Sequence, residues 1–163
     1  MHFHRSSRNF LFGLFSLAAI ALTGCTESTI FPAVVQTVVS VSPYEITPTA
    51  MNASGTVTVS QLTIALKTET GVPSRIVSYS IAYATNLGQP ISQLRVEETP
   101  YDLYLAPSVS TNIPVTVYSQ RVADLYAQST SDISPIRATV ILTVKDVNGN
   151  TVKREASCLL YKF

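Results

Sequence analysis

The run Ala138-Thr139-Val140-Ile141-Leu142-Thr143-Val144-Lys145 decides the fold, together with the segment Asp146-Val147-Asn148-Gly149-Asn150 that follows it. The even-numbered residues of the first run are apolar, and the odd-numbered ones include two threonines and a lysine. This period of two predicts a half-buried β-strand. The Asn-Gly pair readily adopts the positive φ angles of a type I′ turn, and a final strand from Thr151 to Phe163 comes next. The stretch therefore predicts a β-hairpin.

The same alternation occurs further upstream in the chain. Bulky residues at odd positions are separated there by smaller or more polar ones, so each stretch turns one apolar face toward a core. The predicted inward-facing residues are Val77, Tyr79, Ile81 and Tyr83 in one strand and Ile113, Val115 and Val117 in another.

Less regular apolar stretches predict three more strands. Val34–Val41 is expected to open the domain, and Ile91–Glu97 to form a short strand. The segment Tyr101–Leu105 lies between Pro100 and Pro107, and it fits only the edge of a sheet because proline has no N–H to donate to a ladder.

Between Thr56 and Lys67 the apolar positions change from odd to even numbers at Ser60-Gln61. A strand that keeps one face toward the core across such a slip needs one extra residue. The slip therefore predicts a β-bulge at Ser60-Gln61.

The segment Gln120–Ser129 departs from the alternation. Leu125 and Tyr126 follow Val122 at spacings of three and four, which favours a single helical turn covering one end of the core. Either a structural plug or an element of a partner-binding groove fits this pattern.

About seven short strands with no helices between them indicate an all-β fold, an antiparallel sandwich of two sheets. The closing hairpin is similar to that of immunoglobulin-like and fibronectin type III domains. The resemblance covers about residues 34–163. The chain has no Trp and lacks the Cys…Trp…Cys core of antibody domains, so an antibody-type domain is excluded.

A different motif lies near the amino terminus. Arg5 and Arg8 precede the thirteen-residue apolar run Phe10–Leu22, which has the length of a secretory signal and is short for a membrane span. The run ends in Leu22-Thr23-Gly24-Cys25, which resembles the lipobox of bacterial lipoproteins.

The lipoprotein resemblance implies three segments: a signal peptide at residues 1–24, a lipidated tether at 25–33 and the sandwich at 34–163. It implies a diacylglyceryl group and an acyl chain such as palmitate on Cys25, and hence attachment to a membrane of the cell envelope. Thr26 rather than Asp after Cys25 implies the outer membrane if the host has two membranes. A tether of this length spans at most about 30 Å.

Removal of the predicted signal changes the composition. Both histidines, His2 and His4, lie in the signal, and nine Lys and Arg then remain against 10 acidic residues. A formal net charge of −1 predicts no binding to nucleic acid, which needs clustered basic residues. Cys158 is the only thiol left once Cys25 is lipidated, so no intramolecular disulfide is expected. Because it alternates with apolar neighbours, Cys158 is expected to be buried and inert.

No catalytic centre or cofactor is expected. Without histidine, a Ser-His-Asp or Cys-His arrangement and a histidine-based zinc site are impossible in the mature chain. Loop carboxylates of Asp102, Asp124 and Asp132 are expected to be solvated.

Asp146, Asn148 and Asn150 supply oxygen atoms at alternate positions, as the start of an EF-hand calcium loop does. The pattern then fails, because Thr151 stands where the loop requires Gly and Ser157 where it requires a bidentate Glu. A hairpin turn explains the same residues.

An exposed surface at Tyr101, Asp102 and Tyr104 is the candidate binding site, because an edge segment between prolines is expected to be accessible. We expect a non-enzymatic envelope lipoprotein that acts as a structural, assembly or protein-interaction module, with the membrane and other envelope proteins as partners. A small module binding glycan or peptide through these residues is the alternative.

Overall fold

A computed structural model describes residues 36–48, 56–69, 71–129 and 133–162. The chain divides into two units, and all described residues belong to the second, Ala33–Phe163. The predicted signal peptide, Cys25 and the tether lie outside the described residues, as do Val34 and Val35 of the predicted opening strand.

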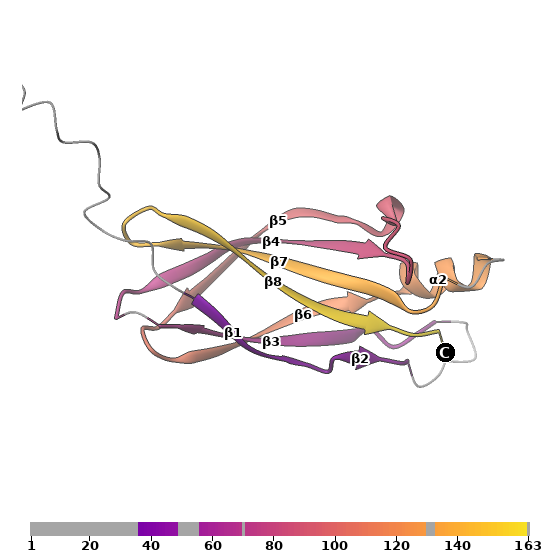
Figure 1. Ribbon diagram of the computed structural model, residues 1–163, viewed down its shortest axis with the longest axis horizontal. Helices are drawn as coiled ribbons and strands as arrows, with labels where there is room; N and C mark the ends of the chain where they lie inside the picture. Colours follow the sequence, from indigo (N-terminus) through magenta and orange to yellow (C-terminus); the bar gives the residue numbers. More distant parts are fainter. Residues whose placement is uncertain (1–35, 49–55, 70, 130–132, 163) are drawn as a thin grey trace, which may run out of the picture. The chain divides into compact units, whose positions relative to one another are not determined.

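The described residues form two packed sheets (Figure 1). The order is β1-β3-β6 in the smaller sheet and β2-β8-β7-β4-β5 in the larger one, and only the short β2–β8 pair is parallel. This confirms the predicted antiparallel, immunoglobulin-like all-β sandwich, with its first strand divided between the sheets as β1 and β2. The strands are β1 (Gln36–Ser42), β2 (Glu45–Ile46), β3 (Ser60–Thr68), β4 (Ser74–Ala84), β5 (Val96–Leu105), β6 (Ser110–Tyr118), β7 (Ile136–Asp146) and β8 (Thr151–Leu160).

Alternating side chains from both sheets fill the core between them. Burying each large aliphatic side chain contributes roughly 1.5–3 kcal/mol, so this layer is the main source of stability in a domain without a disulfide. Among the most deeply buried side chains are Leu62, Ile64, Leu66, Ile113, Val117, Ile136, Val140, Leu142 and Val144.

The inward face of β4 differs from the prediction at one position. Tyr79, Ile81 and Tyr83 face the core side, but Val77 is 38% exposed, and Ile76 is fully buried in its place. The pairing of β4 with both neighbours shifts between Ile76 and Ser78, so a bulge inserts one residue and reverses the alternation there.

The predicted bulge at Ser60-Gln61 is confirmed by a register shift at that point in the β3–β6 pairing. The slip in the apolar pattern therefore marked a real irregularity of the strand. β3 itself begins at Ser60 and not at Thr56.

The separate strand predicted at Ile91–Glu97 is wrong. A short 3₁₀ helix, η1 (Ser92–Leu94), occupies the middle of that range, and β5 then runs unbroken from Val96 to Leu105. Pro100 lies inside β5 rather than before it. The edge position predicted for Tyr101–Leu105 is confirmed, because β5 is the last strand of its sheet.

The closing hairpin of β7 and β8 is present, but its turn is not type I′. Gly149 has a positive φ of 88° and Asn148 does not. The Gly149 amide donates to the Asp146 carbonyl at 3.1 Å, and the Asp146 amide donates to the Asn150 carbonyl at 3.0 Å. These bonds define a type I turn followed by a glycine bulge.

Gly149→Val is expected to destabilise the domain by about 1–3 kcal/mol. A Cβ at Gly149 would meet no atom within 4 Å, so the cost comes from the positive φ and not from a clash. Gly71→Val is the matched control, since Gly71 also has open space but no positive φ, and its urea midpoint should stay near that of the wild type. Similar losses of stability in the Gly149→Val and Gly71→Val variants would show that any added side chain in either loop destabilises the domain.

The helical element between β6 and β7 is longer than the predicted single turn. It is the nine-residue helix α2 (Gln120–Gln128), which buries Val122, Ala123 and Tyr126 against one end of the core. The three-residue and four-residue spacings identified its type but not its length.

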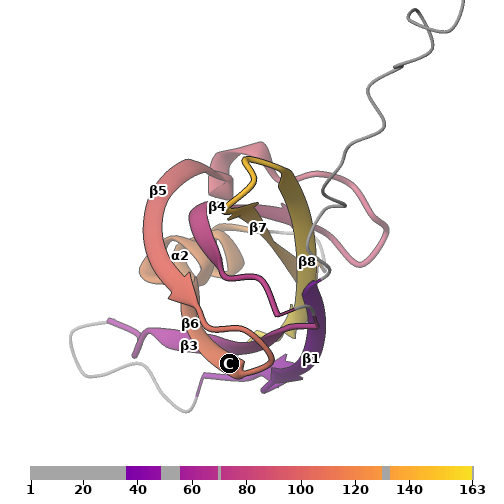
Figure 2. The same ribbon diagram turned by 90° about the vertical axis from the view of Figure 1, so that its left-hand side faces the viewer.

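The two ends of the sandwich differ. We call one the tether end, because Gln36, the first described residue, lies there with the β3–β4, β5–β6 and β7–β8 connections (Figure 1). Figure 2 looks onto this end and shows β1 and β8 side by side where the two sheets meet. Helix α2 and the end of β8 lie at the other end, which we call the far end.

Candidate functional site

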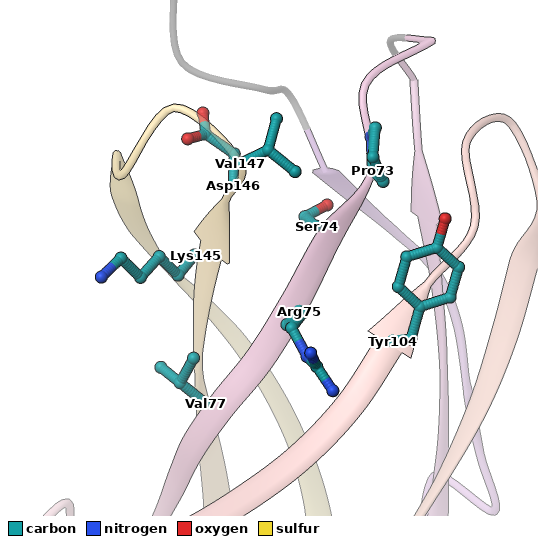
Figure 3. Close-up of a pocket in the computed structure, with 8 residues that line it drawn as sticks. All are labelled: Pro73, Ser74, Arg75, Val77, Tyr104, Lys145, Asp146 and Val147. Atoms are coloured by element: carbon teal, nitrogen blue, oxygen red, sulfur yellow. The ribbon is translucent and has the colours of Figure 1, made fainter.

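The candidate site is a shallow pocket on the outer face of the larger sheet, close to the tether end (Figure 3). Strand pairing builds it, because Arg75 of β4 pairs with Tyr104 of β5 on one side and with Lys145 of β7 on the other. The three side chains form a cross-strand row on the outer face.

The pocket encloses about 230 Å³. The β3–β4 connection contributes Pro73, and Val147 projects from the β7–β8 turn. Val147 is 67% exposed and Tyr104 is 54% exposed, so the walls offer apolar and aromatic surface to solvent. The lining residues are Pro73, Ser74, Arg75, Val77, Tyr104, Lys145, Asp146 and Val147.

Two cations lie in this row. The Arg75 guanidinium is held in a bidentate pair by Asp102, with Nε to Oδ1 at 2.8 Å and Nη2 to Oδ2 at 3.0 Å. Both partners are largely exposed, so the pair contributes at most about 1 kcal/mol to stability and serves mainly to orient Arg75. Lys145 is exposed and has no carboxylate within ion-pair distance among the described residues.

The predicted surface of Tyr101, Asp102 and Tyr104 is divided by the fold. Asp102 and Tyr104 lie on the outer face, where Asp102 holds Arg75 and Tyr104 lines the pocket. Tyr101 is half-buried and packs against the core, its ring edge-to-face with Tyr79 at 5.8 Å. Tyr101 therefore belongs to the packing of the domain and not to the pocket.

The Asp146 carboxylate is occupied by the hairpin. Oδ1 accepts the amides of Asn148 and Asn150, each at 2.9 Å, and Oδ2 accepts the Asn150 side-chain amide at 2.9 Å. These bonds agree with a turn rather than a calcium loop. No group of three or more potential metal ligands occurs within the described ranges.

Cys158 is 1% exposed, as its alternation with apolar residues predicts. Burial raises the pKa of the thiol to about 11, so the nucleophilic thiolate is a very small fraction at neutral pH. Burial likewise raises the pKa of Tyr83 to about 12, and its hydroxyl donates to the Val117 carbonyl at 3.0 Å. Both groups are structural.

Two edge strands of the sandwich carry a proline near their middle: Pro100 in β5 and Pro114 in β6. A proline removes one N–H from the strand, which weakens pairing with an added strand. The outer face with its pocket is therefore a better binding surface than either of these two edges.

The described residues define a domain of the immunoglobulin-like β-sandwich class, with a small basic and aromatic pocket on one face. No family model and no curated protein matches the chain. Among solved structures, the chain is similar to a protein from Archaeoglobus fulgidus at 14% identity, covering 78% of this chain and 95% of that one with a TM-score of 0.39. A likeness of that degree carries no inference about function. No helix among the described residues is long and apolar enough to cross a membrane.

Sequence reasoning identified Tyr104 and Asp102 but missed Arg75, Lys145 and Val147. These residues are distant in sequence and meet only through the β5-β4-β7 order and register. The one available signal was that Lys145 occupies an outward position of a strongly alternating strand.

Proposed function

We propose that this chain is a non-enzymatic lipoprotein of the cell envelope, held to a membrane by lipid on Cys25. Its sandwich acts as an interaction module close to that membrane. The observation that carries this proposal is that β1 begins at Gln36, eleven positions after the lipobox-like cysteine, at the end of the sandwich that bears the pocket.

The attachment of Gln36 supports a short working distance. Its side chain is 3% exposed, its Nε2 donates to Ser74 Oγ at 3.3 Å, and its carbonyl accepts Arg154 Nε at 2.6 Å. A force applied through the tether must break these buried contacts before β1 can separate from the sheet. The eleven Cα-to-Cα steps from Cys25 to Gln36 reach at most about 40 Å, so partners must lie near the headgroups.

The absence of histidine after His4 supports a role other than catalysis, because the commonest general base is missing from the proposed mature chain. In the pocket, Arg75 is paired with Asp102, and the Asp146 carboxylate is bonded within its own turn. Because the Arg75 guanidinium and the Asp146 carboxylate are held in place by these bonds, they are suited to the recognition of a polar surface.

Replacing Cys25 by Ser is expected to abolish lipidation, because the lipid is joined through the cysteine sulfur. Cells fed an alkyne fatty acid should label the wild-type protein and leave the C25S variant unlabelled, with the variant lost from the membrane fraction. Cys158→Ser is the matched control and should keep full labelling. Equal labelling of wild type and C25S would refute the anchor.

Insertion of about thirty flexible residues after Thr29 is expected to change the set of interacting proteins, since it raises the reach of the tether several-fold. In-cell crosslinking should capture membrane-proximal envelope proteins with the wild type and a broader set with the insertion variant. Capture of only soluble, membrane-distant proteins by the wild type would reject a role at the membrane.

Glycan or peptide binding is the second candidate function. It is favoured by the exposed ring of Tyr104 beside Arg75, because an aromatic face next to a hydrogen-bond donor suits a sugar ring or a peptide side chain. Tyr104→Ser should then abolish retention on immobilised envelope glycan or peptide without changing the fold.

A further inference from the structure

We infer that the pocket at Tyr104, Arg75 and Lys145 rests on the phospholipid surface of the membrane that anchors the chain. This inference depends on the proposed lipid anchor and specifies what the site touches. The bound partner would be the headgroup layer itself, with the sandwich tilted so that the corner between the outer sheet face and the β7–β8 turn meets it.

The position of the pocket relative to the chain entry is the first argument. Ser74 lines the pocket, and its hydroxyl accepts a hydrogen bond from the Gln36 side chain. Ser74 is 1% exposed and bonds Gln36 on the core side of β4, so the pocket on the outer face lies at the same end of the sandwich as Gln36, on the opposite side of this strand. With Cys25 eleven residues earlier, a bilayer is the one surface that the sequence itself brings near this site.

The chemistry of the pocket is the second argument. Tyrosine is enriched at membrane interfaces because its ring is apolar and its hydroxyl is polar, and Tyr104 is exposed in the lining of the pocket, to which Pro73 and Val147 also contribute. Lys145 adds a cation on a flexible stem that can reach phosphate oxygens while its methylenes contact acyl chains. Arg75 uses two of its five N–H donors on Asp102, so three remain for a phosphate.

The size of the pocket is the third argument. Pockets that enclose a small ligand usually measure about 300–1,000 Å³, whereas this one is about 230 Å³. The pocket is better suited to contact part of an extended surface than to enclose a ligand.

The charge of the pocket is modest, because Asp102 and Asp146 lie close to the cations Arg75 and Lys145. We therefore expect contact with zwitterionic lipid that becomes stronger with anionic lipid.

The absence of tryptophan in the chain allows a direct test, because a single introduced indole reports on its own position. Full-length lipidated Tyr104→Trp and Leu87→Trp proteins are each reconstituted into phosphatidylcholine vesicles with brominated acyl chains, with and without phosphatidylglycerol. Leu87 is 82% exposed in the β4–β5 connection at the far end, so it is the matched control. Bromine quenching of the indole in the Tyr104→Trp protein should exceed that in the Leu87→Trp protein at least twofold, with a blue-shifted emission in the Tyr104→Trp protein alone.

Lys145→Glu in the Tyr104→Trp background should reduce both the quenching and its increase with phosphatidylglycerol. Circular dichroism establishes that each variant is folded. Equal quenching at positions 87 and 104, or quenching at position 104 that is insensitive to Lys145→Glu, would overturn the inference. If the indole at position 104 is instead protected only when an envelope protein or peptide is added, the pocket binds that partner and not lipid.

The same samples separate this inference from the proposed function. If the protein carries no fatty-acid label and does not remain with the vesicles, the proposed lipid anchor is refuted. Labelled, vesicle-bound protein in which the indole at position 104 is no more quenched than the one at position 87 would leave the anchor intact and reject only the lipid contact.

Discussion

Replacing Tyr126 by Phe is expected to destabilise the domain by about 2–4 kcal/mol. The Tyr126 hydroxyl lies under helix α2, where it donates to the Leu160 carbonyl and accepts the Ile136 amide at 3.0 Å. It therefore joins the helix to the last residue of β8 and the first residue of β7. The variant leaves two buried backbone groups without this partner, and each such group costs about 1–3 kcal/mol.

Tyr118→Phe is the matched control for this prediction. Tyr118 is as deeply buried as Tyr126, but its hydroxyl has no hydrogen-bond partner among the described residues, and burial raises its pKa to about 12. Removing an unpaired buried hydroxyl should leave the stability unchanged or increase it. Urea denaturation of wild type and both variants measures the difference. Equal losses from the two variants would contradict the assigned role of Tyr126.

The pairing of β7 with β8 illustrates what alternation predicts well. A strand with one buried face repeats every second residue, so Val140, Leu142 and Val144 were assigned inward from sequence, and all three are buried. The slip at Ser60-Gln61 was visible for the same reason, because apolar residues lie on both sides of it.

The bulge at Val77 was not visible in the sequence. Val77 continues the odd-numbered apolar series of β4, so the uninterrupted pattern hides the extra residue, and only the pairing with β5 and β7 reveals it. Pro100 misled the prediction in the opposite way. A proline is tolerated within an edge strand, so β5 continues through Pro100 and joins the end of the first predicted segment to the second.

The pocket was only partly predictable because strand order decides it. Tyr101 and Tyr104 look equivalent in sequence, yet a separation of three residues puts them on opposite faces of β5. Arg75 and Lys145 join Tyr104 only once β4 is known to lie between β5 and β7. Local patterns carry no information about that order.

Asp146→Ala is expected to destabilise the domain by about 2–4 kcal/mol. The carboxylate is 7% exposed and accepts two backbone amides and one side-chain amide within the β7–β8 turn. Hydrogen bonds to a charged group are worth about 1.5–3 kcal/mol each, and the variant loses all three at once, partly offset by water reaching the turn. Thermal denaturation followed by circular dichroism measures the loss.

Asp102→Ala is the matched control for Asp146→Ala, because it also removes a carboxylate that accepts hydrogen bonds, here two from the exposed partner Arg75. Solvent screens that pair, so its loss should cost at most about 1 kcal/mol. Calcium should not move the melting temperature of the wild type or of either variant, since the hairpin amides already occupy the Asp146 oxygens. Equal losses of stability in the two variants would mean that burial and the turn amides add nothing to the role of Asp146. A rise in melting temperature with calcium in the wild type and in Asp102→Ala, but not in Asp146→Ala, would restore the metal site that the turn geometry argues against.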